Sequence, residues 1–135
     1  MEQVGINGSS IIYKTIPAGS SAALLPASGA RALSSNEAAA DIIALAGALQ
    51  GPVTVTVPPS LFPQNVGTDP QSPLWSGPVA LSWIKIFQNN STGAQPVTIS
   101  AGGPNTAGFT AAEQGKSKMF YSPDGVNVFA AGPAV

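Results

Sequence analysis

Proline and glycine interrupt this chain so often that no long unbroken element fits into it. The sequence has 13 prolines and 15 glycines among 135 residues, and these residues are the strongest local terminators of regular structure. Between them the apolar residues form short runs at a spacing of about ten residues, as in β-sandwiches and small barrels. Because hydrophobic residues reach 44%, we interpret the prolines and glycines as turns and not as disorder. The chain therefore predicts a mainly β protein.

Alternation of apolar and polar residues marks the individual strands. They are predicted at residues 11–16, 53–57, 79–88, 97–100, 118–122 and 126–130. The segment 79–88 is apolar on both pleat faces, as expected of a central strand. A tight turn at Pro123-Asp124-Gly125 joins the last two strands, since proline presets φ and glycine accepts a positive φ. Together the strands predict an antiparallel β-sandwich that resembles a jelly roll.

One short α-helix is expected at about residues 35–50. Ser34-Ser35-Asn36-Glu37 matches the capping box, in which a serine oxygen and a glutamate satisfy the first amides of a helix,. Apolar residues then recur at helical spacing, at Ile42, Leu45, Ala46 and Leu49,. Gly51-Pro52 would end this helix.

Residues 1–10 are expected to form an N-terminal arm, and residues 11–135 a single β-rich domain. Within the domain, residues 58–78 contain six prolines and predict a long, stiff loop of the kind that often carries function. Four large apolar residues of this loop are the interface candidates: Leu61, Phe62, Leu74 and Trp75. Trp75 is either an interface anchor, a residue that fastens the loop to the body, or a sugar-stacking platform, whereas Trp83 is expected in the core.

The scarcity of charge excludes several classes of function. Only 8% of the residues are charged, the net charge is −1, and there is no histidine or cysteine. Nucleic-acid binding depends on clustered lysine and arginine, which this chain lacks. The longest uncharged run, residues 42–68, is broken by four prolines, so no membrane-spanning helix is expected. We expect neither nucleic acid nor a membrane as a partner.

Catalytic motifs are weak as well. Without histidine or cysteine the common nucleophile–base pairs are absent. Glu37 and Asp41, four residues apart, are a candidate carboxylate pair, but acids at a helix start usually serve the cap and the helix dipole. Gly115-Lys116-Ser117 resembles the end of a phosphate-binding loop, yet Thr110 stands where that motif needs glycine,. No Asp-x-Asp metal pattern exists,. We expect no enzyme, no cofactor and no metal.

The second half of the chain has a recurring order of strands and turns. First, a strand ends in asparagine and is joined by a turn to the next strand. Further along the chain, a Gly-x-Ser sequence precedes a strand, and an Asp-Gly turn precedes the last strand. The segments are Ile84-Lys85-Ile86-Phe87-Gln88-Asn89, Pro96-Val97-Thr98-Ile99, Gly115-Lys116-Ser117-Lys118-Met119-Phe120-Tyr121-Ser122 and Asp124-Gly125-Val126-Asn127-Val128-Phe129. This pattern, over roughly residues 79–130, resembles small virion proteins of tailed bacteriophages, most of all capsid decoration (cement) proteins.

The resemblance implies a small β-sandwich, often trimeric, that sits on the outer surface of an assembled capsid. The expected function is to stabilise the shell by binding across its subunits, so the partners would be the major capsid protein of the same particle and further copies of this chain. Residues 1–10 and 58–78 are the expected contact regions. Two alternatives stay open: a subunit associated with a tail or fibre, and a small carbohydrate-binding module.

Overall fold

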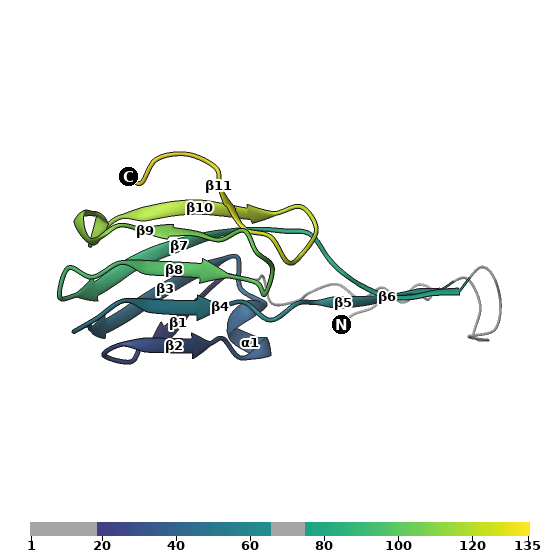
Figure 1. The fold of residues 1–135 in the computed structure, drawn as a ribbon, viewed down its shortest axis with the longest axis horizontal. Coiled ribbons are helices and arrows are strands. Elements are labelled where there is room, and N and C mark those ends of the chain that lie inside the picture. The colour runs from purple at the N-terminus through teal and green to yellow at the C-terminus, as the bar shows by residue number, and fades with distance from the viewer. Residues whose placement is uncertain (1–18, 66–74) are drawn as a thin grey trace.

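The computed structural model describes residues 19–65 and 75–135 and shows two β-sheets packed face to face (Figure 1). The larger sheet contains, in spatial order, β1 (Ser20–Leu24), β3 (Ile42–Ala48), β7 (Trp83–Thr92), β10 (Ser117–Ser122) and β11 (Phe129–Ala130). The smaller sheet contains β2 (Gly29–Ala32), β4 (Val53–Thr56), β8 (Val97–Ser100) and β9 (Ala107–Phe109). The prediction of a mainly β protein is confirmed.

The sheets are mixed, not antiparallel as predicted, because the chain winds between them in coils. Each coil contributes one strand to each sheet: β1 and β2 form the first coil, β3 and β4 the second, and β7 and β8 the third. Successive coils stack in parallel, so β1 pairs with β3, β3 with β7, β2 with β4, and β4 with β8. Strands β9, β10 and β11 then add antiparallel pairs to the last coil.

The second and third coils share a sequence repeat that fits this stacking. Pro52-Val53-Thr54 and Pro96-Val97-Thr98 stand in the same place in their coils, and Val53 pairs with Val97. Ile42 pairs with Ile86 with the same sequence separation. A repeat of this kind is typical of stacked coils, in which each coil covers the apolar side of its neighbour.

The expected helix at residues 35–50 is wrong over most of its length. Helix α1 is a single turn, Ser35–Ala38, which begins with the predicted capping box of Ser34 and Glu37. Residues 42–48 form β3 instead, in the interior of the larger sheet between β1 and β7. Alternate residues of β3, including Ile43 and Leu45, are buried. The segment therefore uses its two-residue apolar period, and pairing on both sides outweighs the helical preference of its alanines.

The other predicted strands fare better. Residues 53–57 and 97–100 correspond to β4 and β8, and 118–122 to β10. The segment 79–88 is divided, because β6 ends at Ala80 and the central strand β7 begins at Trp83. Of residues 126–130 only Phe129–Ala130 form a strand, so the connection after β10 is longer than the predicted turn. The expected arm at residues 1–10 and the strand at 11–16 lie outside the described residues.

The core lies between the two sheets. Phe120 of β10 is fully buried and meets two other rings edge to face, Phe87 of β7 at 5.5 Å and Phe109 of β9 at 5.6 Å between centroids. Both geometries are favourable for aromatic pairs. Since Phe87 and Phe120 come from the larger sheet and Phe109 from the smaller one, these rings join the sheets.

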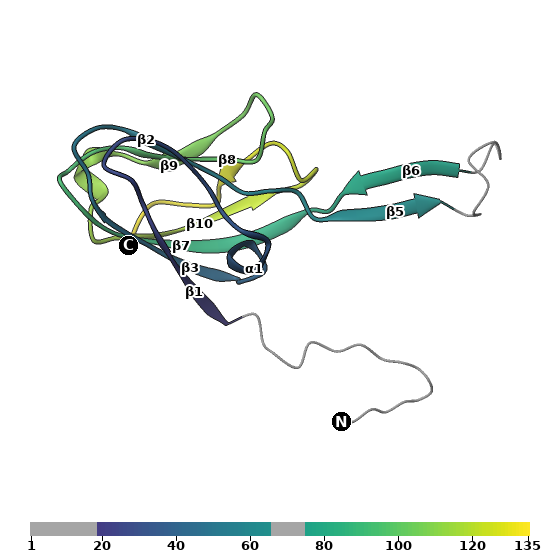
Figure 2. The same ribbon diagram turned by 90° about the horizontal axis from the view of Figure 1, so that it is seen from below.

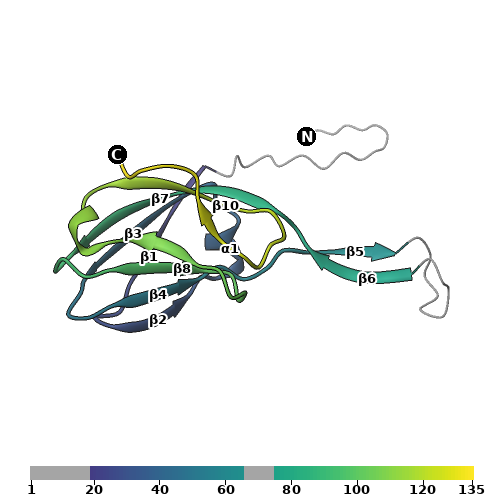
Figure 3. The same cartoon turned by 45° about the horizontal axis from the view of Figure 1, so that its top comes forward.

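Two connections between coils lie at the same end of the sandwich (Figure 1). The first, between β2 and β3, contains only α1. The second, between β4 and β7, contains β5 (Leu61–Asn65) and β6 (Trp75–Ala80), which pair antiparallel. Figure 2 and Figure 3 show from two further directions that this pair extends away from the sandwich. The hairpin β5–β6 is thus an enlarged coil connection.

Candidate functional site

The hairpin β5–β6 carries most of the interface candidates. Leu61 and Phe62 lie at the start of β5, near the body, and their backbones pair with Ala80 and Val79. Trp75 opens β6, where it pairs with Asn65 at the other end of the ladder. Leu74 lies outside the described residues. The segment predicted as a loop therefore contains a two-stranded hairpin, and Leu61, Phe62 and Trp75 lie at different points along it.

Neither strand of the hairpin pairs with any other strand in the described part of the chain. The ladder contains Pro63 opposite Pro78, with a register shift between Pro63 and Asn65. Proline has no amide hydrogen and is compatible with strands that have an unpaired edge. A lone two-stranded hairpin is only marginally stable in water. Such a ribbon is suited to gaining order through contact with a partner.

The root of the hairpin is held from one side by the connection between β10 and β11. The Leu81 amide donates to the Ser60 carbonyl at 2.8 Å and so closes the base of the ribbon. Gly125 packs against this base: a Cβ at Gly125 would lie 2.6 Å from the Ala80 Cβ and 2.8 Å from the Leu81 carbonyl oxygen. The turn predicted at residues 123–125 therefore has a second role that the sequence did not reveal.

Asp124 gives this connection its shape. Its carboxylate accepts hydrogen bonds from the Asn127 amide at 2.8 Å, the Asn127 side-chain Nδ2 at 2.7 Å and the Val126 amide at 3.0 Å. These donors, with Asn127 first, lower the pKa of Asp124 to about 2, because hydrogen bonds to the charged form favour it. Asn127 in turn accepts from the Asn105 amide at 3.0 Å. Two loops are thereby tied together beside the hairpin.

A buried lysine lies on the other side of the root. Lys85, in β7 soon after the hairpin, donates through Nζ to the carbonyls of Ala38 at 2.6 Å and Ala40 at 3.0 Å. These carbonyls belong to the end of α1 and the residues after it, where helical hydrogen bonding stops. The ammonium also lies 5.8 Å from the centre of the Trp83 ring. Trp83 packs against the core as predicted, although it is only partly buried.

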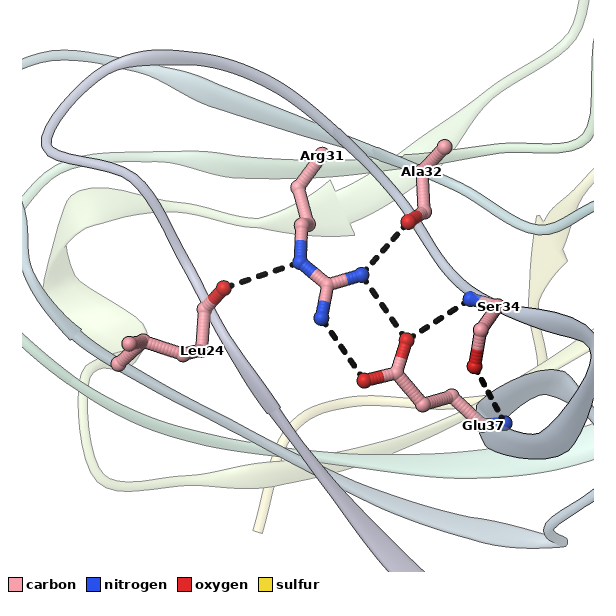
Figure 4. Close-up of polar contacts among 5 residues, drawn as sticks. All are labelled: Leu24, Arg31, Ala32, Ser34 and Glu37. Carbon is pink, nitrogen blue, oxygen red and sulfur yellow. Dashed lines mark hydrogen bonds and ion pairs between the residues drawn. The ribbon is translucent and has the colours of Figure 1, made fainter.

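The carboxylate pair considered from the sequence is not a pair on one helix, since Asp41 lies beyond α1. Glu37 is occupied by Arg31, which donates through Nη1 and Nη2 at 2.9 and 2.8 Å (Figure 4). Glu37 also accepts from the Ser34 amide at 2.8 Å. Arg31 first, and then Ser34, lower the pKa of Glu37 to about 2. This cluster fastens α1 to β2, and Arg31 reaches β1 through the Leu24 carbonyl at 3.1 Å.

Within residues 19–65 and 75–135, no group of three or more His, Cys, Asp or Glu side chains is placed to hold a metal ion. No helix in that part of the chain is long and apolar enough to cross a membrane. Comparison with protein-family models, curated protein sequences and solved structures finds no match to this chain.

Proposed function

We propose that this protein is a structural virion protein that decorates an assembled phage capsid on its outer surface and stabilises it by binding across subunits of the major capsid protein. The observation that carries the proposal is the hairpin β5–β6, which extends beyond the sandwich instead of packing on it (Figure 2). A ribbon of this kind adds nothing to the core of its own body but can reach a neighbouring subunit. Leu61, Phe62 and Trp75, the candidates for contact, belong to it.

The base of the hairpin supports the same function. The Ser60–Leu81 hydrogen bond closes it, the connection around Gly125 packs against it, and Lys85 anchors the following strand to α1. A ribbon with a fixed base presents its contacts in a defined direction, which lowers the entropy lost on binding.

The distribution of charge is also suited to a lattice. Two ion pairs, Arg31–Glu37 and Lys118–Glu113, are made within the molecule. Contact surfaces with few charges lose little hydration energy when they are covered. On a shell of repeated subunits, a contact that is weak for one site becomes strong when several sites are engaged at once.

The first test is the copy number of this polypeptide in purified particles from its source, by quantitative mass spectrometry. Decoration predicts many copies in a fixed ratio to the major capsid protein. A few copies per particle would favour the tail or fibre alternative instead. Complete absence from particles would refute a virion role and direct the work to glycan binding.

A variant without the hairpin tests the proposed contact. Because the Ser60 carbonyl and the Leu81 amide are already bonded, residues 61–80 can be replaced by an Asn-Gly turn,. The shortened protein should keep the circular dichroism spectrum of a β protein and lose co-sedimentation with undecorated shells. Thr98→Lys, on the outer side of β8, is the matched control and should bind normally. Full binding by the shortened protein would contradict the proposed contact.

A further inference from the structure

The two sheets of the sandwich have different outer faces. On the smaller sheet, the outward positions carry only small side chains and hydroxyl groups: Ala30, Ala32, Thr54, Thr56, Thr98, Ser100 and Gly108. On the larger sheet, four large apolar side chains are exposed: Leu24, Ile84, Met119 and Tyr121. We call the outer side of β1, β3, β7 and β10 the apolar face.

The strand register brings these side chains together. Ile84 pairs with Tyr121, and Ile86 pairs with Met119 on one side and with Ile42 on the other. Directly paired residues lie on the same face with Cβ atoms about 4.5–5.5 Å apart. Ile84, Met119 and Tyr121 are therefore part of one continuous surface that crosses β3, β7 and β10. Leu24 lies apart from them on β1, where it pairs with Ala46.

No charged residue belongs to the apolar face. Its outward positions are Ser20, Ala22, Leu24, Ile42, Ala44, Ala46, Ala48, Ile84, Ile86, Gln88, Asn90, Thr92, Ser117, Met119 and Tyr121. The two lysines on the same strands point to the inner side, where Lys85 binds the Ala40 carbonyl and Lys118 binds the Gly108 carbonyl at 2.8 Å. The apolar face therefore has no charged side chain that would have to be desolvated when the face is covered.

The size of the apolar face fits a protein interface. Leu24 is 71% exposed, Ile84 64%, Met119 43% and Tyr121 37%. At roughly 150–250 Å² for a free side chain of this size, the contiguous residues Ile84, Met119 and Tyr121 leave on the order of 300 Å² of apolar surface. Patches of ~300–600 Å² are the largest on typical monomers and are often functional.

We propose that the apolar face packs against the same face of another copy of this chain. A second copy fits because it presents the same apolar surface without charged residues, so neither partner has to bury a charge. The shape of the face is also self-complementary, because its exposed side chains lie beside two shallow hollows next to β10. Ile86, Met119 and Val135 line one hollow, and Trp83, Ile84 and Tyr121 line the other. In such an assembly the hydroxyl-rich sheet faces water. This inference goes beyond the proposed function and does not depend on it.

The test is the mass of the full chain in solution at micromolar concentration, by analytical ultracentrifugation. The expected mass is a multiple of the 13.5 kDa chain. Ile84→Lys places a charge on the apolar face beside Tyr121 and should weaken association roughly 100-fold or more, with the circular dichroism spectrum unchanged. The control, Thr98→Lys, places the same charge on the opposite sheet and should leave the mass unchanged.

A 13.5 kDa wild-type protein, or an oligomer that survives Ile84→Lys, would overturn the inference. So would a monomer that associates only after residues 1–18 are removed, because the chain itself would then cover the face. Particle binding separates the two proposals. A monomer that decorates shells overturns only this inference, whereas an Ile84-dependent oligomer that ignores shells contradicts only the proposed function.

Discussion

Replacing Gly125 with alanine measures how firmly the root of the hairpin is held. Gly125 has φ +82°, and an added Cβ would lie 2.6 Å from the Ala80 Cβ. The left-handed backbone costs a residue with a Cβ roughly 1–2 kcal/mol. Overpacking against a neighbour that cannot move adds about 1–3 kcal/mol. We therefore expect Gly125→Ala to lower the free energy of unfolding by about 2–5 kcal/mol.

Gly115→Ala is the matched control, since Gly115 has the same φ of +82° and its Cβ would meet nothing within 4 Å. It should lose only the backbone contribution, about 1–2 kcal/mol. Urea unfolding gives both free energies, and hydrogen exchange at the Leu81 amide shows whether the root of the hairpin opens in Gly125→Ala. Losses that agree within about 0.5 kcal/mol would refute the argument that Gly125 clamps Ala80 and Leu81.

Three further predictions concern the body. Arg31 holds the pKa of Glu37 at about 2, below the unfolded value of about 4.3; the stabilisation is complete above that value and is lost as pH falls toward 2. The urea midpoint of Glu37→Gln should therefore change less between pH 5 and 2 than that of the wild type. An equal change of midpoint with pH in the two proteins would contradict this. Phe120→Ala should cost about 3–5 kcal/mol in urea unfolding, and Phe120→Leu clearly less; equal losses would argue against the ring contacts. Lys85→Met leaves two carbonyls near α1 without this donor and should cost about 1–3 kcal/mol, with faster amide exchange in α1; unchanged exchange would argue against an anchoring role.

Local sequence predicts a strand best where apolar and polar residues alternate strictly. The alternation of apolar and polar residues in 53–57 fits only a strand, and Val53–Thr56 form β4. Residues 42–48 are apolar at almost every position, so they match the helical and the strand period equally well. Pairing with β1 and β7 decides between the two, and these partners are distant in sequence. The capping box at Ser34 was predicted correctly because it depends only on neighbouring residues.

The candidate site was predicted in part for the same reason. The prolines of residues 58–78 marked the segment as unusual, yet they argued against strands there. A two-stranded ribbon tolerates proline because each strand keeps an unpaired edge, as the pair of Pro63 and Pro78 shows. The contact of Gly125 with Ala80 joins residues far apart in sequence and has no local signal. The repeat at Pro52 and Pro96 is present in the sequence and corresponds to the stacked coils, but it was not predicted.

The coiled path has a mechanical consequence. The hairpin is connected to β4 at one end and to β7 at the other. β4 belongs to the smaller sheet and β7 to the larger one, and each has a paired strand on both sides. A pull on the hairpin is thus directed along two interior strands at once. The hydrogen bonds of a strand run across the direction of a pull along its length. They therefore resist it together, in shear, whereas a pull across the strand would break them one after another. The tension is shared by both layers, so the hairpin can transmit force to the body without unravelling its edge.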